Sequence, residues 1–179
     1  NAANKIAKNF NKDKINFDTE IVLKDVSFSY PNSDKLALEN VNLNIKKGEI
    51  VAIIGNSGSG KTTLINLILG FINPNKGEIK VDNKNILNNL ESWQSKLGYV
   101  PQDVYLMDET LRENIAFGIS SDNVNHDLIN EVVKKSRLED FINNLPDKLE
   151  SNVGNVGSKI SGGQRQRIGI ARSLYTKPE

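Results

Sequence analysis

The sequence predicts an α/β protein in which a strand-rich core carries a mostly helical insertion. Two observations lead to this prediction. An apolar run at 50–54, a glycine-rich loop at 55–60 and an apolar helical period at 64–69 follow one another directly, which is the strand–loop–helix order of a parallel α/β unit. Alternation typical of strands precedes about Asn88, whereas apolar residues recur at helical spacing after it.

Size and composition limit the class of protein. A chain of 179 residues can bury one substantial core, or one core and a small helical lobe. Lys+Arg 23 against Asp+Glu 22 gives no electrostatic reason to expect a nucleic acid partner. The absence of cysteine excludes disulfides and thiolate metal sites. No apolar run approaches the length of a membrane span and no signal peptide is visible, so we expect the isolated chain to be soluble.

The first part of the chain is expected to form strands. Residues 1–20 are polar and aperiodic, and we expect a linker there, with a tag remnant as one explanation of its first residues. Alternating apolar positions predict two strands, one on Val26, Phe28 and Tyr30 that ends at Pro31, and one on Val41, Leu43 and Ile45. A turn at 74–77 leads into a strand at 78–81 and a polar turn at 82–85.

The second part is expected to be helical. Thr110 and Glu113 have the spacing of a capping box. Two apolar helix faces follow, Leu128, Ile129, Val132 and Val133 on one and Leu138, Phe141, Ile142 and Leu145 on the other, the second ended by Pro146. We interpret His126 and the cluster Lys134, Lys135 and Arg137 as solvated side chains, and Trp93 as a packing residue.

The glycine loop carries the clearest chemical signal. Gly55-Asn56-Ser57-Gly58-Ser59-Gly60-Lys61-Thr62-Thr63 fits the pattern Gly-x-x-x-x-Gly-Lys-[Ser/Thr] of a phosphate-binding loop. Glycines let backbone N–H groups close around a polyphosphate, and the following helix N-terminus adds aligned donors. Lys61 would reach the β- and γ-phosphates, while the Thr62 hydroxyl would hold Mg²⁺. The alternative is a plain glycine turn, but the flanking strand and helix favour a nucleotide.

A second glycine motif opens a later helix. Ser161-Gly162-Gly163-Gln164 precedes an apolar stripe that includes Ile168, Ala171 and Leu174. Ser161 and Gln164 have capping-box spacing, so one interpretation is a stable helix start. The other is an anion site, because glycines at a helix N-terminus offer bare N–H groups to a phosphate.

These motifs and their order resemble those of ABC-type ATPases, over about residues 21–179. The segment 160–167 looks like the signature motif of that family, and Val100-Pro101-Gln102-Asp103 resembles its Q-loop. Ser29-Tyr30-Pro31 resembles the aromatic loop that stacks on adenine. The segment 110–115 is similar to one found after the Q-loop in exporter-type members. The segment 153–157 resembles the one before their signature, although Asn155 replaces the usual glutamate.

The resemblance implies a fold and a division of the chain. It implies a P-loop NTPase (RecA-like) core with an N-terminal antiparallel β subdomain and an inserted α-helical subdomain. The expected parts are the linker at 1–20, the β subdomain with the phosphate-loop core at 21–87, the Q-loop and helical subdomain at 88–160, and the signature helix with its return towards the core at 161–179.

The resemblance also implies roles for single residues. Tyr30 would stack on the adenine of ATP, and residues 55–63 would hold its phosphates. Gln102 would bind Mg²⁺ or the attacking water and couple the site to a transmembrane partner. The residues Ser161, Gly162, Gly163 and Gln164 would meet the nucleotide of a second copy in a head-to-tail dimer. Tyr30 as an ordinary strand aromatic and Gln102 as a turn residue remain open alternatives.

The sequence ends at residues 176–179. At this point members of the family continue into an apolar strand that ends in an Mg²⁺-positioning aspartate and a catalytic glutamate. We therefore expect a fragment of a longer ATPase, truncated before the Walker B motif, with part of the core missing and negligible hydrolysis of its own. The function expected of the intact protein is ATP hydrolysis that drives transport at the cytoplasmic face of the membrane. The alternatives are a soluble ABC-type ATPase, against which the absence of heptad runs counts, and a non-hydrolysing nucleotide-binding module.

Overall fold

The computed structural model describes residues 14–33, 35–156 and 160–179. The chain forms two compact units, divided in sequence between Ser95 and Lys96, and each unit is described by itself. The elements of the first unit are β1 (Glu20–Phe28), β2 (Leu38–Lys46), α1 (Lys61–Ile68), β3 (Lys76–Val81), β4 (Lys84–Asn85), the 3-10 turn η2 (Ile86–Asn88) and α2 (Leu90–Gln94).

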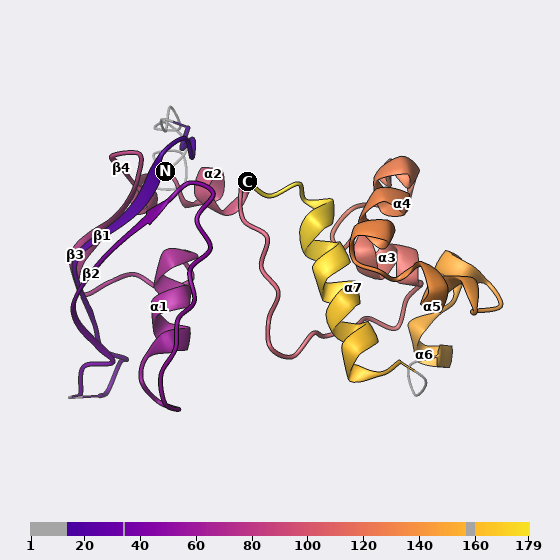
Figure 1. Ribbon diagram of the computed structural model, residues 1–179, viewed down its shortest axis with the longest axis horizontal. Helices are drawn as coiled ribbons and strands as arrows, with labels where there is room; N and C mark the ends of the chain where they lie inside the picture. Colours follow the sequence, from indigo (N-terminus) through magenta and orange to yellow (C-terminus); the bar gives the residue numbers. More distant parts are fainter. Residues whose placement is uncertain (1–13, 34, 157–159) are drawn as a thin grey trace, which may run out of the picture. The chain divides into compact units, whose positions relative to one another are not determined.

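The first unit is built on an antiparallel sheet with the strand order β2-β1-β3-β4. Figure 1 shows α1 on one side of this sheet. Leu23 is paired with Leu43 on one neighbouring strand and with Ile79 on the other. The buried apolar side chains of the sheet and helices include Leu23, Val26, Leu67, Ile79, Val81, Ile86 and Trp93. The predicted antiparallel strands are thereby confirmed, although β1 ends at Phe28, two residues before Tyr30.

The buried strand predicted at 50–54 is wrong. These residues form no strand, and Ile50 and Ile54 are 97% and 92% exposed. A strand requires a neighbour that accepts and donates its backbone hydrogen bonds. Within the described residues, the sheet pairs only β2, β1, β3 and β4, and none of these strands pairs with 50–54. An apolar run identifies a segment that is suited to burial but does not supply its partner.

The segment before β1 is fixed to the first unit. Residues 1–13 of the expected linker lie outside the described residues, but Ile15 is buried and its backbone N–H donates to the hydroxyl of Ser92 at 2.9 Å. The ring of Phe17 meets the ring of Trp93 edge-on at 6.4 Å. Trp93 itself is buried and donates Nε1–H to the carbonyl of Ile68 at 2.8 Å, which confirms it as a packing residue.

Asp82, which follows β3, forms hydrogen bonds with the segment that leads into β1. Its carboxylate accepts hydrogen bonds from the backbone N–H groups of Asp18, Thr19 and Glu20 and from the Thr19 hydroxyl. Partial burial alone would raise the pKa of Asp82, but the bonds from Thr19, Asp18 and Glu20 outweigh it and lower that pKa from 3.8 to about 2. One carboxylate therefore holds the start of β1.

The second unit is helical. Its elements are α3 (Leu111–Ile115), η3 (Ser121–Asn123), α4 (His126–Lys135), α5 (Glu139–Asn143), η4 (Lys148–Glu150), α6 (Val153–Val156) and α7 (Gly162–Tyr175). Helix α7 packs against α3 and α4 (Figure 1). The expected apolar faces supply the core, with Ile129, Val132, Leu138 and Ile142 buried beside Ile168 and Ala171 of α7. No helix in the described ranges is both long and apolar enough to cross a membrane.

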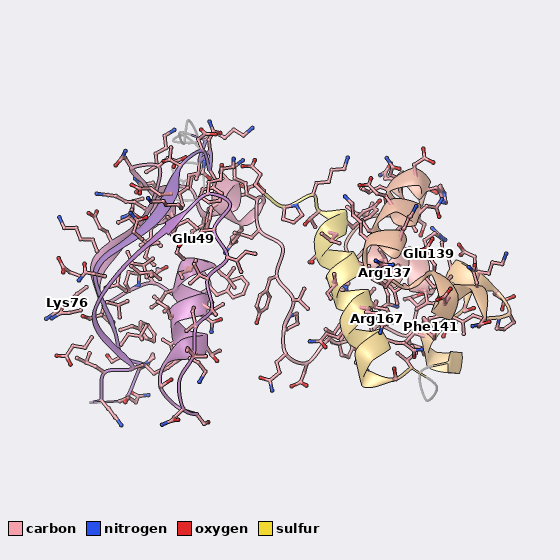
Figure 2. All side chains as sticks on the ribbon, in the orientation of Figure 1. Glu49, Lys76, Arg137, Glu139, Phe141 and Arg167 are labelled. Carbon is pink, nitrogen blue, oxygen red and sulfur yellow. The ribbon has the colours of Figure 1, made fainter. Side chains whose placement is uncertain are left out.

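Polar contacts fix the helix ends of this unit. The capping box predicted at Thr110 and Glu113 is present, with Glu113 N–H donating to the Thr110 hydroxyl at 3.1 Å. Arg137 follows α4 and has a φ of 56°. Nη1 of Arg167 donates a hydrogen bond to the carbonyl of Arg137 at 3.4 Å. Figure 2 labels both arginines in the same part of the unit. His126 begins α4 and is exposed, as predicted.

Candidate nucleotide-binding site

The phosphate loop is an exposed turn that leads directly into α1. Gly58 and Gly60 have φ values of 78° and 89°, in the left-handed region that glycine adopts without a Cβ penalty. A Cβ on Gly60 would lie 2.7 Å from the backbone oxygen of Ala37. Glycine is therefore required there by close packing as well as by backbone conformation.

The start of α1 suits an anion. The helix N-cap is Gly60, which offers no side chain to the N–H groups of the first turn, and this turn contains no acidic residue. The N–H groups and the partial positive charge of the helix end are therefore not opposed by a local carboxylate. A phosphate group fits such a helix start.

Lys61 adds a full positive charge at the same place. Its Nζ donates to the carbonyls of Gly55 and Asn56 at 2.9 and 2.7 Å. The ammonium is therefore held across the glycine loop rather than directed away from it. Thr62, the residue expected to hold Mg²⁺, follows Lys61 in α1 and is exposed.

Tyr30 lies beside the first turn of α1. Its hydroxyl is 3.0 Å from Oγ1 of Thr63, and its ring meets that of Phe28 edge-on at 5.0 Å. The side chain is nevertheless 46% exposed. The structure thus brings the aromatic expected to stack on adenine and the phosphate loop together, within one unit. The contact with Thr63 was not predicted, because it joins residues that are far apart in the sequence.

The second unit brings Gln102 beside the signature segment. Gln102 lines a pocket of about 420 Å³ together with Asp103, Val104, Gly162, Arg165 and Gln166. Proximity of Gln102 to the signature helix was not foreseen from the sequence, and neither was the part of Arg165 and Gln166 in the lining. The lining carries one positive side chain, Arg165, and one negative side chain, Asp103.

The start of α7 combines both interpretations of the Ser161–Gln164 motif. Ser161 Oγ accepts from Gln164 N–H at 3.2 Å, and Ser161 N–H donates to Gln164 Oε1 at 2.9 Å, so the capping box is present. Gly162 and Gly163 are exposed, and a Cβ on either would meet nothing within 4 Å apart from the adjoining residues and backbone of its own helix. The capped helix end therefore also presents an open glycine surface.

Two groups of predicted site residues result. Tyr30 and residues 55–63 belong to the first unit, whereas Gln102 and the residues 161–164 belong to the second. Thr62 and Gln102, the residues expected to reach Mg²⁺, are thus divided between the units. Among the described residues, no group of three or more His, Cys, Asp and Glu side chains could hold a metal ion. Gly157, the end of the exporter-like segment at 153–157, lies outside the described residues.

Comparison with known proteins identifies the family. The family model described as ABC transporter matches residues 38–179. The chain belongs to the ABC transporter family. The matched range of this ABC-family chain contains the phosphate loop, Gln102 and the signature segment, while Tyr30 precedes it.

Individual relatives of the ABC-family chain include a flippase and a multidrug resistance transporter. It is 42% identical over 164 residues to the "ATP-dependent lipid A-core flippase" of Francisella novicida, and the aligned residues make up 91% of the chain and 27% of the flippase. It is 39% identical over 157 residues to the "Multidrug resistance ABC transporter ATP-binding and permease protein" of Lactococcus lactis, and the aligned residues make up 87% of the chain and 26% of that protein. The chain thus spans about a quarter of the length of these curated relatives.

A solved structure gives the same result. The structure of a bacterial Atm1-family ABC exporter with ATP bound matches 94% of the chain and 30% of its own length, with a TM-score of 0.84 and 34% identity. These findings confirm the resemblance to the ATP-binding domain of ABC exporters and the predicted α/β fold class of P-loop ATPases.

Proposed function

We propose that this chain is the ATP-binding domain of an ABC exporter and that it binds Mg-ATP through the loop at 55–63. The single observation that supports this most is the start of α1. There an uncapped helix end, two left-handed glycines and the Lys61 ammonium all lie at one exposed turn, with no acidic residue in the first turn. The exporters among the relatives support the wider role, which is ATP hydrolysis coupled to transport.

Each site residue has a proposed task. Lys61 binds the β- and γ-phosphates once its ammonium exchanges the loop carbonyls for phosphate oxygens. Thr62 offers its hydroxyl to Mg²⁺, whose charge would neutralise the phosphates during transfer. Tyr30 stacks its ring on the adenine. Gln102 orients the attacking water or binds Mg²⁺.

The signature segment is proposed to act on a second copy of the domain. In a head-to-tail dimer, Ser161, Gly162 and Gly163 would contact the γ-phosphate held by the partner's phosphate loop. The open surface at Gly162 and Gly163 supports this, because backbone N–H groups there can approach a phosphate without steric conflict.

A transmembrane partner is proposed for the second unit, which would place the domain at the cytoplasmic face of the membrane. A mostly apolar pocket of about 290 Å³ is lined by residues that include Tyr99, Phe117 and Ile119, which are 43%, 52% and 45% exposed. Exposed apolar side chains around a pocket indicate an interaction surface. The guanidinium of Arg172 lies 4.8 Å from the ring centre of Phe117 and adds a positive charge to this surface.

Turnover is proposed to need residues beyond this sequence. Residues 1–179 contain no apolar strand ending in acidic residues after the signature helix, and none of the proposed site residues is a carboxylate. We therefore expect the chain of 179 residues to bind nucleotide but to hydrolyse it negligibly, because positioning and charge stabilisation provide most of phosphoryl-transfer catalysis.

The experiment is a phosphate-release assay on this chain and on a version extended through an acidic motif, at equal concentrations. The extended version should turn over, and its Lys61→Ala variant should not. Comparable Lys61-dependent turnover by the shorter chain would refute the proposal that turnover needs residues beyond this sequence. An acidic residue inside residues 1–179 would then be responsible, and Asp103 and Asp108 would be the first to test.

A further inference from the structure

The ring of Tyr30 is restrained on both sides although the residue is half exposed. On one side it packs edge-on against Phe28, with ring centres 5.0 Å apart and an interplanar angle of 86°. At its far end, the hydroxyl shares a hydrogen bond of 3.0 Å with Thr63 Oγ1. An exposed tyrosine without such contacts would sample several side-chain rotamers. Here the two contacts restrain the orientation of the ring beside α1.

Thr63 and the backbone that leads into the ring are both held in place. Thr63 is the third residue of α1 and is 5% exposed, and a β-branched side chain in a helix has few χ1 alternatives. The backbone before the ring is also fixed, because the Ser29 N–H donates to Asn75 Oδ1 at 2.6 Å. Asn75 in turn donates its own N–H to the carbonyl of Ser27 at 2.9 Å.

We propose that Thr63 is a positioning residue for base recognition, and that it acts through the hydroxyl of Tyr30. This inference rests on the proposed function, since it requires Tyr30 to receive the adenine. The Thr63 hydroxyl holds the aromatic ring at the orientation in which it stacks, so that little ordering remains to be done when the nucleotide binds. Because Thr63 belongs to α1, the same helix that holds the phosphates also sets the position of the base platform.

The proposal separates two roles that Thr63 can have. A residue that acts on the phosphates changes the affinity for any polyphosphate. A residue that acts through Tyr30 changes only the affinity for ligands that carry a base. Inorganic tripolyphosphate with Mg²⁺ has the phosphates of ATP without base or ribose, and it therefore distinguishes the two roles.

The experiment is a double-mutant cycle with Tyr30→Phe, Thr63→Val and the double variant. Affinity for Mg-ATP is measured by calorimetry, and affinity for Mg-tripolyphosphate by displacement of a fluorescent nucleotide. Loss of one neutral hydrogen bond should weaken ATP binding about 2- to 10-fold in each single variant, and the double variant should be no weaker than either. Tripolyphosphate affinity should stay within 2-fold of the parent in Tyr30→Phe. In Thr63→Val it should fall by a smaller factor than ATP affinity does, since Thr63 also belongs to the loop at 55–63. Thr63→Ser, which keeps the hydroxyl, should bind ATP as the parent does.

Each other outcome overturns the inference. Equal losses for ATP and tripolyphosphate in Thr63→Val would mean that Thr63 acts on the phosphates. Additive losses in the double variant, or ATP affinity unchanged in Tyr30→Phe, would mean that the shared bond does not position the ring. Tyr30 is exposed, so Tyr30→Phe tests the bond even if Thr63→Val unfolds, as a thermal melt would show. A parent chain that binds neither ligand would refute the proposed function itself.

Discussion

Replacing Asp82 with alanine should loosen the segment that leads into β1. The carboxylate accepts from four donors, three of them backbone N–H groups of Asp18, Thr19 and Glu20. Bonds to a charged group are worth roughly 1.5–3 kcal/mol each when buried, but water can replace part of this at a partly exposed site. Helix caps of similar geometry are worth about 0.5–2 kcal/mol. We therefore expect Asp82→Ala to lower the free energy of unfolding of the first unit by about 1–3 kcal/mol at pH 7.

The loss of unfolding free energy in Asp82→Ala should depend on pH in a defined direction. The pKa of Asp82 is about 2 in the folded chain against an ordinary value of 3.8, so the folded state favours the ionised form. The stabilisation is therefore fully present above about pH 5 and is lost as the pH falls through 4 towards 2. The difference between parent and Asp82→Ala should be smaller at pH 3 than at pH 7.

Trp93 provides the assay, since it is the only tryptophan and contacts the segment through Phe17. Urea unfolding followed by Trp93 fluorescence reports on the first unit. Glu39→Ala, at an exposed carboxylate on β2, is the matched control and should change the free energy of unfolding by less than about 0.5 kcal/mol. An Asp82→Ala variant as stable as this control, or a difference from the parent that does not shrink at pH 3, would refute the reasoning.

Two further predictions test the site and the sheet. Tyr30→Ala should weaken Mg-ATP by roughly 1–3 kcal/mol, by analogy with base stacking on aromatics, whereas Tyr30→Trp should largely preserve binding; unchanged affinity of the alanine variant in calorimetry would remove Tyr30 from the site. Gly77→Ala should destabilise the first unit by more than Gly48→Ala, as measured by urea unfolding. Both glycines have φ near 80°, but a Cβ on Gly77 would lie 2.4 Å from the backbone oxygens of Lys24 and Asp25, while one on Gly48 would meet nothing within 4 Å. Equal losses would show that the backbone conformation alone sets the cost.

Features defined by local sequence could be predicted. The loop at 55–60 that opens α1 and the capping boxes at Thr110 and Ser161 depend on residues a few positions apart, and all are present. The family could also be inferred, because the order of its motifs is written in the sequence.

Features that depend on distant partners could not be predicted. The run at 50–54 has the composition of a buried strand, but it pairs with none of the strands that the structure describes, and composition cannot supply a neighbour. The bond between Tyr30 and Thr63 and the closure of the entering segment by Asp82 join residues that lie far apart in the sequence. Only the folded chain brings these groups together.

The most direct test of the central claim is the affinity for Mg-ATP of the parent chain and of Lys61→Ala, measured by calorimetry. Loss of the ammonium removes a charge-assisted contact worth roughly 1.5–3 kcal/mol, so affinity should fall about 10- to 150-fold. Lys24→Ala, at an exposed lysine on β1, is the control and should bind as the parent does. If Lys61→Ala is folded and binds Mg-ATP as tightly as the parent, the loop at 55–63 is not the nucleotide site.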